Sequence, residues 1–104
     1  MSEHYILNAA GDAEPCDLMT WAKWLGTANR VLASDKRDGV HVSTVFLGLN
    51  HRYDNFGPPL IWETMIFGGP HDQYQDRYST KAEALTGHEK ACELAFGSTG
   101  TGVD

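Results

Sequence analysis

The stretch "VHVSTVFLGLNHRYDNFGPPLIWETMIF", residues 40–67, decides the fold because two β-prone segments flank a polar loop. β-branched, aromatic and other large apolar residues dominate 40–49 and 60–67, as is typical of strands. In 40–49 one alternating face is mostly apolar, and the other is polar at its start and apolar at its end. This pattern indicates a central strand with both faces partly covered. We therefore predict that the two segments pair as an antiparallel hairpin.

Three segments extend this picture toward the N-terminus. Residues 4–8, "HYILN", are apolar, β-prone and followed by turn-forming "AAGDAEP", so we predict an edge strand. Residues 16–29 predict a helix that Asp17 caps, because apolar side chains recur at intervals of three and four. Residues 30–39 predict a short strand that ends in the turn signal "RDG". The apolar positions of the helix are Leu18, Trp21, Ala22, Leu25 and Ala28.

The C-terminal third predicts a short edge strand and a second helix. The polar and aromatic segment "HDQYQDRYST", residues 71–80, suits an edge strand that leads directly into the helix. Thr80 and Glu83 have the capping-box spacing, in which each side chain satisfies a backbone N–H near the other. We therefore expect a helix over 81–96. Its predicted apolar face consists of Leu85, Cys92 and Phe96, with the small residues Ala82, Ala84, Ala91 and Ala95 between them.

The order of these segments predicts an α+β fold. Short connections make the middle strands antiparallel, so we expect one antiparallel sheet of four or five strands with two helices packed on one face. Residues 1–96 form the single predicted domain, and 97–104 are a flexible C-terminal tail. The second sheet face would expose aromatic residues, which favours a homo-oligomer.

Composition limits the classes of partner. The chain has 104 residues, 41% of them hydrophobic, and a formal net charge of −6. Scattered basic residues in an acidic chain argue against direct nucleic-acid binding. There is no membrane-spanning apolar stretch and no signal-peptide pattern, which predicts a cytoplasmic protein without membrane partners. Cys16 and Cys92 are too few for a disulfide scaffold or a zinc site, so we expect free thiols.

The loop "NHRYDNFGPP", residues 50–59, is the main candidate site, because a hairpin loop usually has two to five residues. Arg52 suits a phosphate or carboxylate group, and Tyr53 or Phe56 suits a stacked ring. The alternative is a solvated loop stabilised by local turns of Asp54 and Asn55. The predicted ligand-binding residues are Asn50, His51, Arg52, Tyr53, Trp62, Glu63 and Arg77.

Two other sites stay open at this stage. His51 and Glu63 would form a general base held by an acid if the loop folds back, although Glu63 can equally pair with a cation such as Arg77. Ser79, Thr80 and Arg77 would hold a phosphate at the start of the second helix, or Thr80 would only cap that helix.

No catalytic residue, metal ligand or cofactor motif is predicted. No serine or cysteine stands in a recognisable nucleophile turn, and "FGGP" is not a phosphate-binding loop. The histidines show no H-x-H or H-x-x-x-H spacing, so only a metal site assembled from distant residues remains open. They are His4, His41, His51, His71 and His88.

Three motifs together carry a family resemblance. They are "VSTVFLGLNH" (42–51), "GPPLIWETMIFGG" (57–69) and "RYSTKAEALTGHEKA" (77–91). This set resembles a group of small, uncharacterised proteins of bacteriophages and prophages, over about half of the chain. Asn50 stands where relatives are expected to have Asp, which weakens any Asp–His pair with His51. The resemblance implies a class of small acidic phage proteins that interfere with host defence, either by binding a defence protein or by sequestering a nucleotide signal.

From these observations we expect a phage-encoded, non-enzymatic binding protein in the cytoplasm of the host. Its predicted ligand is a small, anionic, nucleotide-like molecule. One alternative is an inhibitor that binds a host defence protein through the acidic residues Asp35, Asp38, Glu83, Glu89 and Glu93. Another is a small hydrolase that uses His51 and Glu63, and a plain structural or virion-assembly role is also open.

Overall fold

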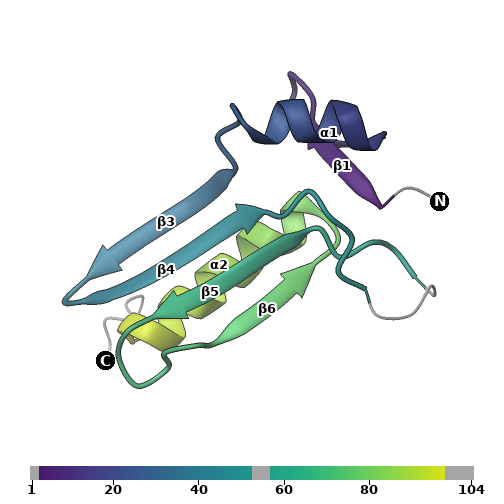
Figure 1. Ribbon diagram of the computed structural model, residues 1–104. Helices are drawn as coiled ribbons and strands as arrows, with labels where there is room; N and C mark the ends of the chain where they lie inside the picture. Colours follow the sequence, from purple (N-terminus) through teal and green to yellow (C-terminus); the bar gives the residue numbers. More distant parts are fainter. Residues whose placement is uncertain (1–2, 53–56, 98–104) are drawn as a thin grey trace.

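The computed structural model describes residues 3–52 and 57–97, and they form an α+β fold with two antiparallel sheets (Figure 1). The smaller sheet pairs β1 (His4–Leu7) with β2 (Ala13–Cys16), and the larger has the order β3-β4-β5-β6. The larger sheet consists of β3 (Val31–Arg37), β4 (Val40–Phe46), β5 (Trp62–Phe67) and β6 (Gln75–Tyr78). The helices are α1 (Leu18–Leu25) and α2 (Lys81–Phe96).

The larger sheet is a meander in which each strand pairs antiparallel with the next. Asp38 and Gly39 join β3 to β4 with φ values of 51° and 82°, the left-handed conformations that a tight hairpin turn needs. β4 and β5 pair in the register that sets Thr44 opposite Thr64. The predicted central hairpin is confirmed, and so are the predicted strands on either side of it.

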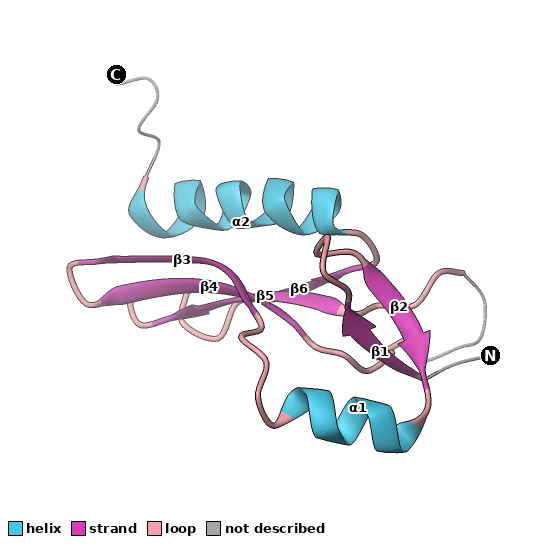
Figure 2. Ribbon diagram, turned by 90° about the horizontal axis from the view of Figure 1, so that it is seen from above, coloured by secondary structure: helices cyan, strands magenta, loops and turns pink. Residues whose placement is uncertain are grey.

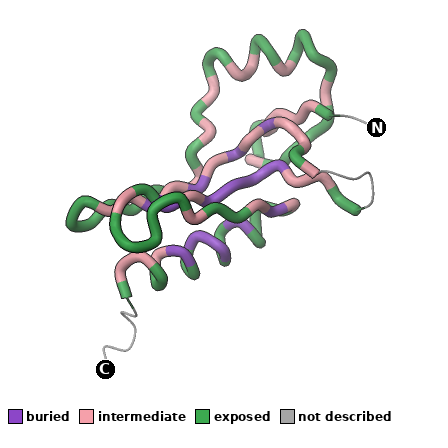
Figure 3. Tube along the Cα trace, turned by 60° about the horizontal axis from the view of Figure 1, so that its bottom comes forward, coloured by how far each residue is buried: buried purple, intermediate pink, exposed green. Residues whose placement is uncertain are grey.

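Helix α2 lies on one face of the larger sheet (Figure 2) and contacts all four of its strands. Alternate residues of β4 and β5 point to α2, and they are fully or almost fully buried there. Figure 3 shows the buried positions along these central strands and along α2. The core between sheet and helix contains Val42, Phe46, Ile61, Trp62, Ile66, Tyr78, Ala84 and Ala91.

The sequence predicts two helices on one face of the sheet. Helix α1, however, does not lie on the face that α2 covers. It packs on β1, and its Trp24 ring meets the edge of Phe46 with ring centroids 5.7 Å apart. β1 in turn bonds to the chain that follows β4, with Tyr5 N donating to Gly48 O at 2.8 Å. The helix therefore continues the core at one end of the sheet and leaves the face under α2 to a single helix.

Strand β2 occupies part of a segment that the sequence predicts as a turn. Its four residues, "AEPC", are mostly exposed and have no β-prone pattern. The hairpin is closed instead by Asn8, whose Oδ1 accepts hydrogen bonds from Ala10 N and Asp12 N. Pro15 is tolerated because the strand is at an edge.

Helix α2 has the predicted bounds, and the predicted Thr80–Glu83 capping box is present, but its buried face differs from the prediction. Leu85 is 43% exposed, whereas the buried positions are Ala84, Gly87, His88 and Ala91. The large side chains of the sheet fill the space beneath the helix, so the helix contributes small residues. Asp17 caps α1 as predicted, by accepting from Thr20 N at 2.8 Å.

No helix within residues 3–52 and 57–97 is long and apolar enough to cross a membrane. Residues 98–104, the greater part of the predicted tail, lie outside the described chain.

Candidate functional site

Two grooves flank α2, one beside each outer strand of the larger sheet. The arginine groove lies between α2, β6 and the loop before β5, with a volume of about 570 Å³. The aspartate groove lies between α2 and β3, with a volume of about 390 Å³. Both volumes fall in the range of small-molecule sites.

The arginine groove collects positive charge in an acidic protein. Three cations and two carboxylates line it, whereas the whole chain carries six more acidic than basic residues. The cations come from the loop, from β6 and from the third turn of α2. The lining residues are Arg52, Pro58, Leu60, Asp76, Arg77, Tyr78, Ser79, Ala82, Glu83, Thr86, Gly87 and Lys90.

Arg52 is held in the groove wall by the two ends of its own loop. Its Nε donates to the carbonyl of Pro58 at 2.7 Å. Asn50 Oδ1 accepts from the backbone N–H groups of Arg52, at 2.9 Å, and Leu60, at 3.1 Å. Asn50 therefore stabilises the loop through local hydrogen bonds, as side chains would in the solvated-loop alternative. Because these bonds fix both ends, the Arg52 guanidinium has a defined position.

Arg77 enters the groove wall from the outer strand β6, and Glu63 orients it. Arg77 Nε donates to Glu63 Oε2 at 2.9 Å, and Gln75 Nε2 donates to the same oxygen at 2.8 Å. Glu63 is only 9% exposed, so its charge needs these partners. The register pairs Glu63 with Arg77 on the sheet face opposite α2, and Arg77 is also among the residues that line the groove.

The other predicted site residues do not gather with these two arginines. Trp62 is 2% exposed and belongs to the core under α2, so its ring cannot contact a ligand. His51 is exposed, and its backbone N–H donates to Leu60 O. Glu63 bonds to Arg77 and Gln75, so the structure gives no support to a His51–Glu63 hydrolase pair. Tyr53, Asp54, Asn55 and Phe56 lie outside the described residues.

The start of α2 is already occupied by its own capping box. Glu83 Oε1 accepts from the N–H groups of Ser79 and Thr80, both at 3.1 Å. Thr80 Oγ1 accepts from Glu83 N at 3.1 Å. A carboxylate therefore neutralises this helix end, and the capping alternative describes it better than a phosphate site does.

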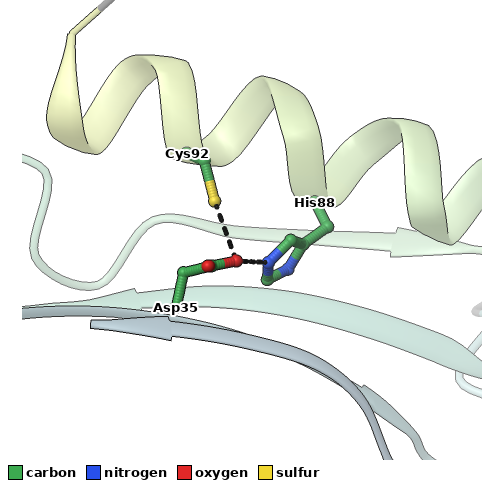
Figure 4. A group of neighbouring side chains, drawn as sticks. All are labelled: Asp35, His88 and Cys92. Atoms are coloured by element: carbon green, nitrogen blue, oxygen red, sulfur yellow. Dashed lines mark hydrogen bonds and ion pairs between the residues drawn. The ribbon is translucent and has the colours of Figure 1, made fainter. Parts of the chain in front are cut away.

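The aspartate groove contains a cluster that the sequence does not predict as a site. Figure 4 shows Asp35 of β3 directed at His88 and Cys92 of α2. Asp35 Oδ2 is 2.7 Å from His88 Nε2 and 3.6 Å from Cys92 Sγ. The three ligand-type atoms lie within 4.8 Å of one another, and they form the one metal-capable group of this kind in the part of the chain described.

His88 continues into a buried chain of hydroxyl groups beneath α2. Its Nδ1 is 2.7 Å from Thr44 Oγ1, and Thr44 Oγ1 is hydrogen-bonded to Thr64 Oγ1. Both threonines are fully buried, and His88 is 6% exposed. Tyr78 Oη lies beyond, buried and without a hydrogen-bond partner among the described residues. Burial raises the pKa of the Tyr78 hydroxyl, and nearby Thr64 partly opposes that shift without reaching hydrogen-bond geometry.

The cluster resembles a nucleophile triad in composition but not in chemistry. Burial, and then the Asp35 carboxylate, raise the pKa of the Cys92 thiol to about 11, so it stays protonated and unreactive near neutrality. Thr44 is closed off from solvent by α2 and cannot reach a substrate. The hydrogen bond from His88 lowers the pKa of Asp35, which remains a carboxylate.

One sequence signal points to this cluster. His88 and Cys92 are four residues apart on a predicted helix, which places them on the same helical face. The third member, Asp35, is 53 residues from His88 and becomes a neighbour only through the tertiary fold.

Comparison with known proteins adds no family: no family model matches the chain, and neither a curated protein nor a solved structure matches it. The resemblance to small phage proteins therefore stays a prediction, as does phage origin.

Proposed function

We propose that the chain is a non-enzymatic binding protein that captures a small anionic ligand, of nucleotide size, in the arginine groove. The observation that carries this proposal is the convergence of Arg52, Arg77 and Lys90, from three different elements, on one groove of about 570 Å³. A guanidinium binds phosphate or carboxylate through paired N–H donors, and Lys90 adds a third positive charge. The same residues stand apart in sequence, so their convergence is a product of the fold.

The ligand binds to side chains and not to the end of α2. The capping box uses Glu83 at that end, whereas Arg52 and Lys90 line the groove from the loop and from the third turn of α2. Ser79 and Thr86 add hydroxyl groups to the same wall, and these suit the sugar or phosphate oxygens of a nucleotide.

The test is equilibrium titration of the purified protein with inorganic phosphate and with ribonucleoside mono-, di- and triphosphates. The expected result is saturable binding of a member of this set. Lys90→Gln and Arg52→Gln should each weaken it by about 1.5–3 kcal/mol, the scale of a charged hydrogen bond, which is roughly a tenfold to hundredfold loss of affinity.

A matched control is Lys23→Gln, which removes an exposed lysine of α1 outside the residues that line the groove. It should leave the affinity unchanged. Arg77→Ala is a poorer test because it would leave Glu63 buried without its cation. No binding by any of these anions, or equal affinity in Lys90→Gln and Lys23→Gln, would overturn the proposal and favour the alternative in which a host protein is the partner.

A further inference from the structure

We propose that Asp35, His88 and Cys92 form a binding site for one borderline divalent transition metal ion of the Zn²⁺ class. The site lies on the opposite side of α2 from the arginine groove and does not depend on the function proposed for that groove. Carboxylate, imidazole and thiolate together are a ligand set that Zn²⁺ accepts.

The geometry is close to what a metal ion needs, because the three ligand atoms already lie within 4.8 Å of one another. A tetrahedral ion with bonds of about 2.0–2.3 Å sets its ligand atoms about 3.3–3.7 Å apart. The Asp35–Cys92 distance of 3.6 Å already fits, and the Asp35–His88 distance of 2.7 Å must lengthen. Asp35 can supply that movement, because its side chain is 58% exposed on an outer strand.

The hydroxyl chain under α2 can hydrogen-bond to either tautomer of the neutral His88 ring. With Nε2–H donating to Asp35, Nδ1 accepts a hydrogen bond from the Thr44 hydroxyl. With Nε2 bound to a metal ion, the ring proton moves to Nδ1, which donates to Thr44 Oγ1, and Thr44 then donates to Thr64. The second pattern is the hydrogen bond from the far ring nitrogen that orients most metal-binding histidines.

The surroundings of the cluster leave a position for a further ligand. The aspartate groove opens beside the three side chains, and two more carboxylates, those of Glu89 and Glu93, line it. Three protein ligands and an open fourth position are the arrangement in which a bound ion can still take water or a small molecule. On binding, the Cys92 thiol releases its proton to solvent, the His88 ring keeps one proton, now on Nδ1, and no redox step is involved.

The experiment is a titration of the reduced, metal-free full chain with Co²⁺, followed by optical absorption. The expected result is one Co²⁺ per chain with a thiolate-to-cobalt charge-transfer band, which Zn²⁺ then displaces. Cys92→Ser should abolish the band, and Asp35→Asn should weaken binding by about tenfold or more.

Cys16→Ser is the matched control, because it removes the other free thiol and should keep the band. Asp35 is exposed, so Asp35→Asn should retain the fold, which circular dichroism checks. A wild-type protein that folds but shows no thiolate–cobalt band would overturn the proposal, and so would a band that survives in Cys92→Ser. Either result would leave the cluster as a hydrogen-bonded contact that only holds α2 on β3.

Discussion

Helix α2 is held on its two sides by different kinds of contact. On the β6 side Gly87 sits directly against the phenol of Tyr78, so shape alone fixes the distance between helix and strand. On the β3 side the next residue, His88, reaches across to Asp35 and down to Thr44 through hydrogen bonds. The tightly packed side therefore tolerates almost no added volume, whereas the polar side is held by hydrogen bonds and is where we propose that an ion binds.

The largest expected effect is on the packed side, in Gly87→Ala. A methyl group there would overlap the Tyr78 ring, and both residues are buried. Helix propensity alone predicts that this substitution stabilises α2 by about 1 kcal/mol. The overlap should outweigh that gain and lower the free energy of unfolding by about 1–3 kcal/mol in urea denaturation. Thr86→Ala, at an exposed neighbouring position, is the control and should change stability little. A Gly87→Ala protein more stable than wild type would contradict the packed-side description.

The second effect is on the polar side, in Thr44→Val. The substitution keeps the shape but removes the hydroxyl group that links His88 to Thr64, and all three side chains are buried. The polar atoms left without a partner should cost about 1–3 kcal/mol of unfolding free energy. Ser43→Val, at the neighbouring position on the other face of β4, is the comparison and should cost less. Equal losses of unfolding free energy for the two substitutions would show that the hydrogen bonds of the hydroxyl chain do not stabilise the fold.

The smallest effect concerns the pH dependence of the Asp35–His88 contact. The hydrogen bond from His88 lowers the pKa of Asp35 from 3.8, so the contact contributes fully above pH 3.8. That contribution is lost as the pH falls below 3.8, through the folded-state pKa. Because Asp35 is exposed, solvent screening keeps the contribution below about 1 kcal/mol. The difference in thermal unfolding between wild type and Asp35→Asn should therefore be present at pH 6 and shrink as the pH falls below 3.8. A difference between the two proteins that stays the same at every pH would show that the carboxylate charge of Asp35 does not cause the stabilisation.

Local sequence rules were sufficient for the strands of the larger sheet and for α2. Alternation predicts β4 and β5, and the Thr80–Glu83 spacing predicts the start of α2, because these signals act within a few residues. The sequence does not predict strand β2, because its pairing depends on the Asn8 turn and not on its own residues.

The candidate site was predicted only in part. Arg52 and Arg77 line one groove, as a shared anion site would require, but Trp62 is in the core and Asn50 supports the loop. The prediction that Leu85 belongs to the buried face of α2 is wrong. Helical periodicity carries no information about the large side chains that the sheet already supplies. The approach of Asp35 to His88 depends on the order of strands in the sheet, which no local pattern contains.

Native mass spectrometry of freshly purified protein, before and after denaturation, tests most directly the claim that α2 separates two binding sites of opposite charge preference. The account predicts two separable added masses, a small anion that Lys90→Gln loses and a metal ion that Cys92→Ser loses, each variant keeping the other mass. The same spectrum gives the oligomeric state. A chain that carries neither mass, and takes up neither when Zn²⁺ and nucleotides are supplied, would contradict the account.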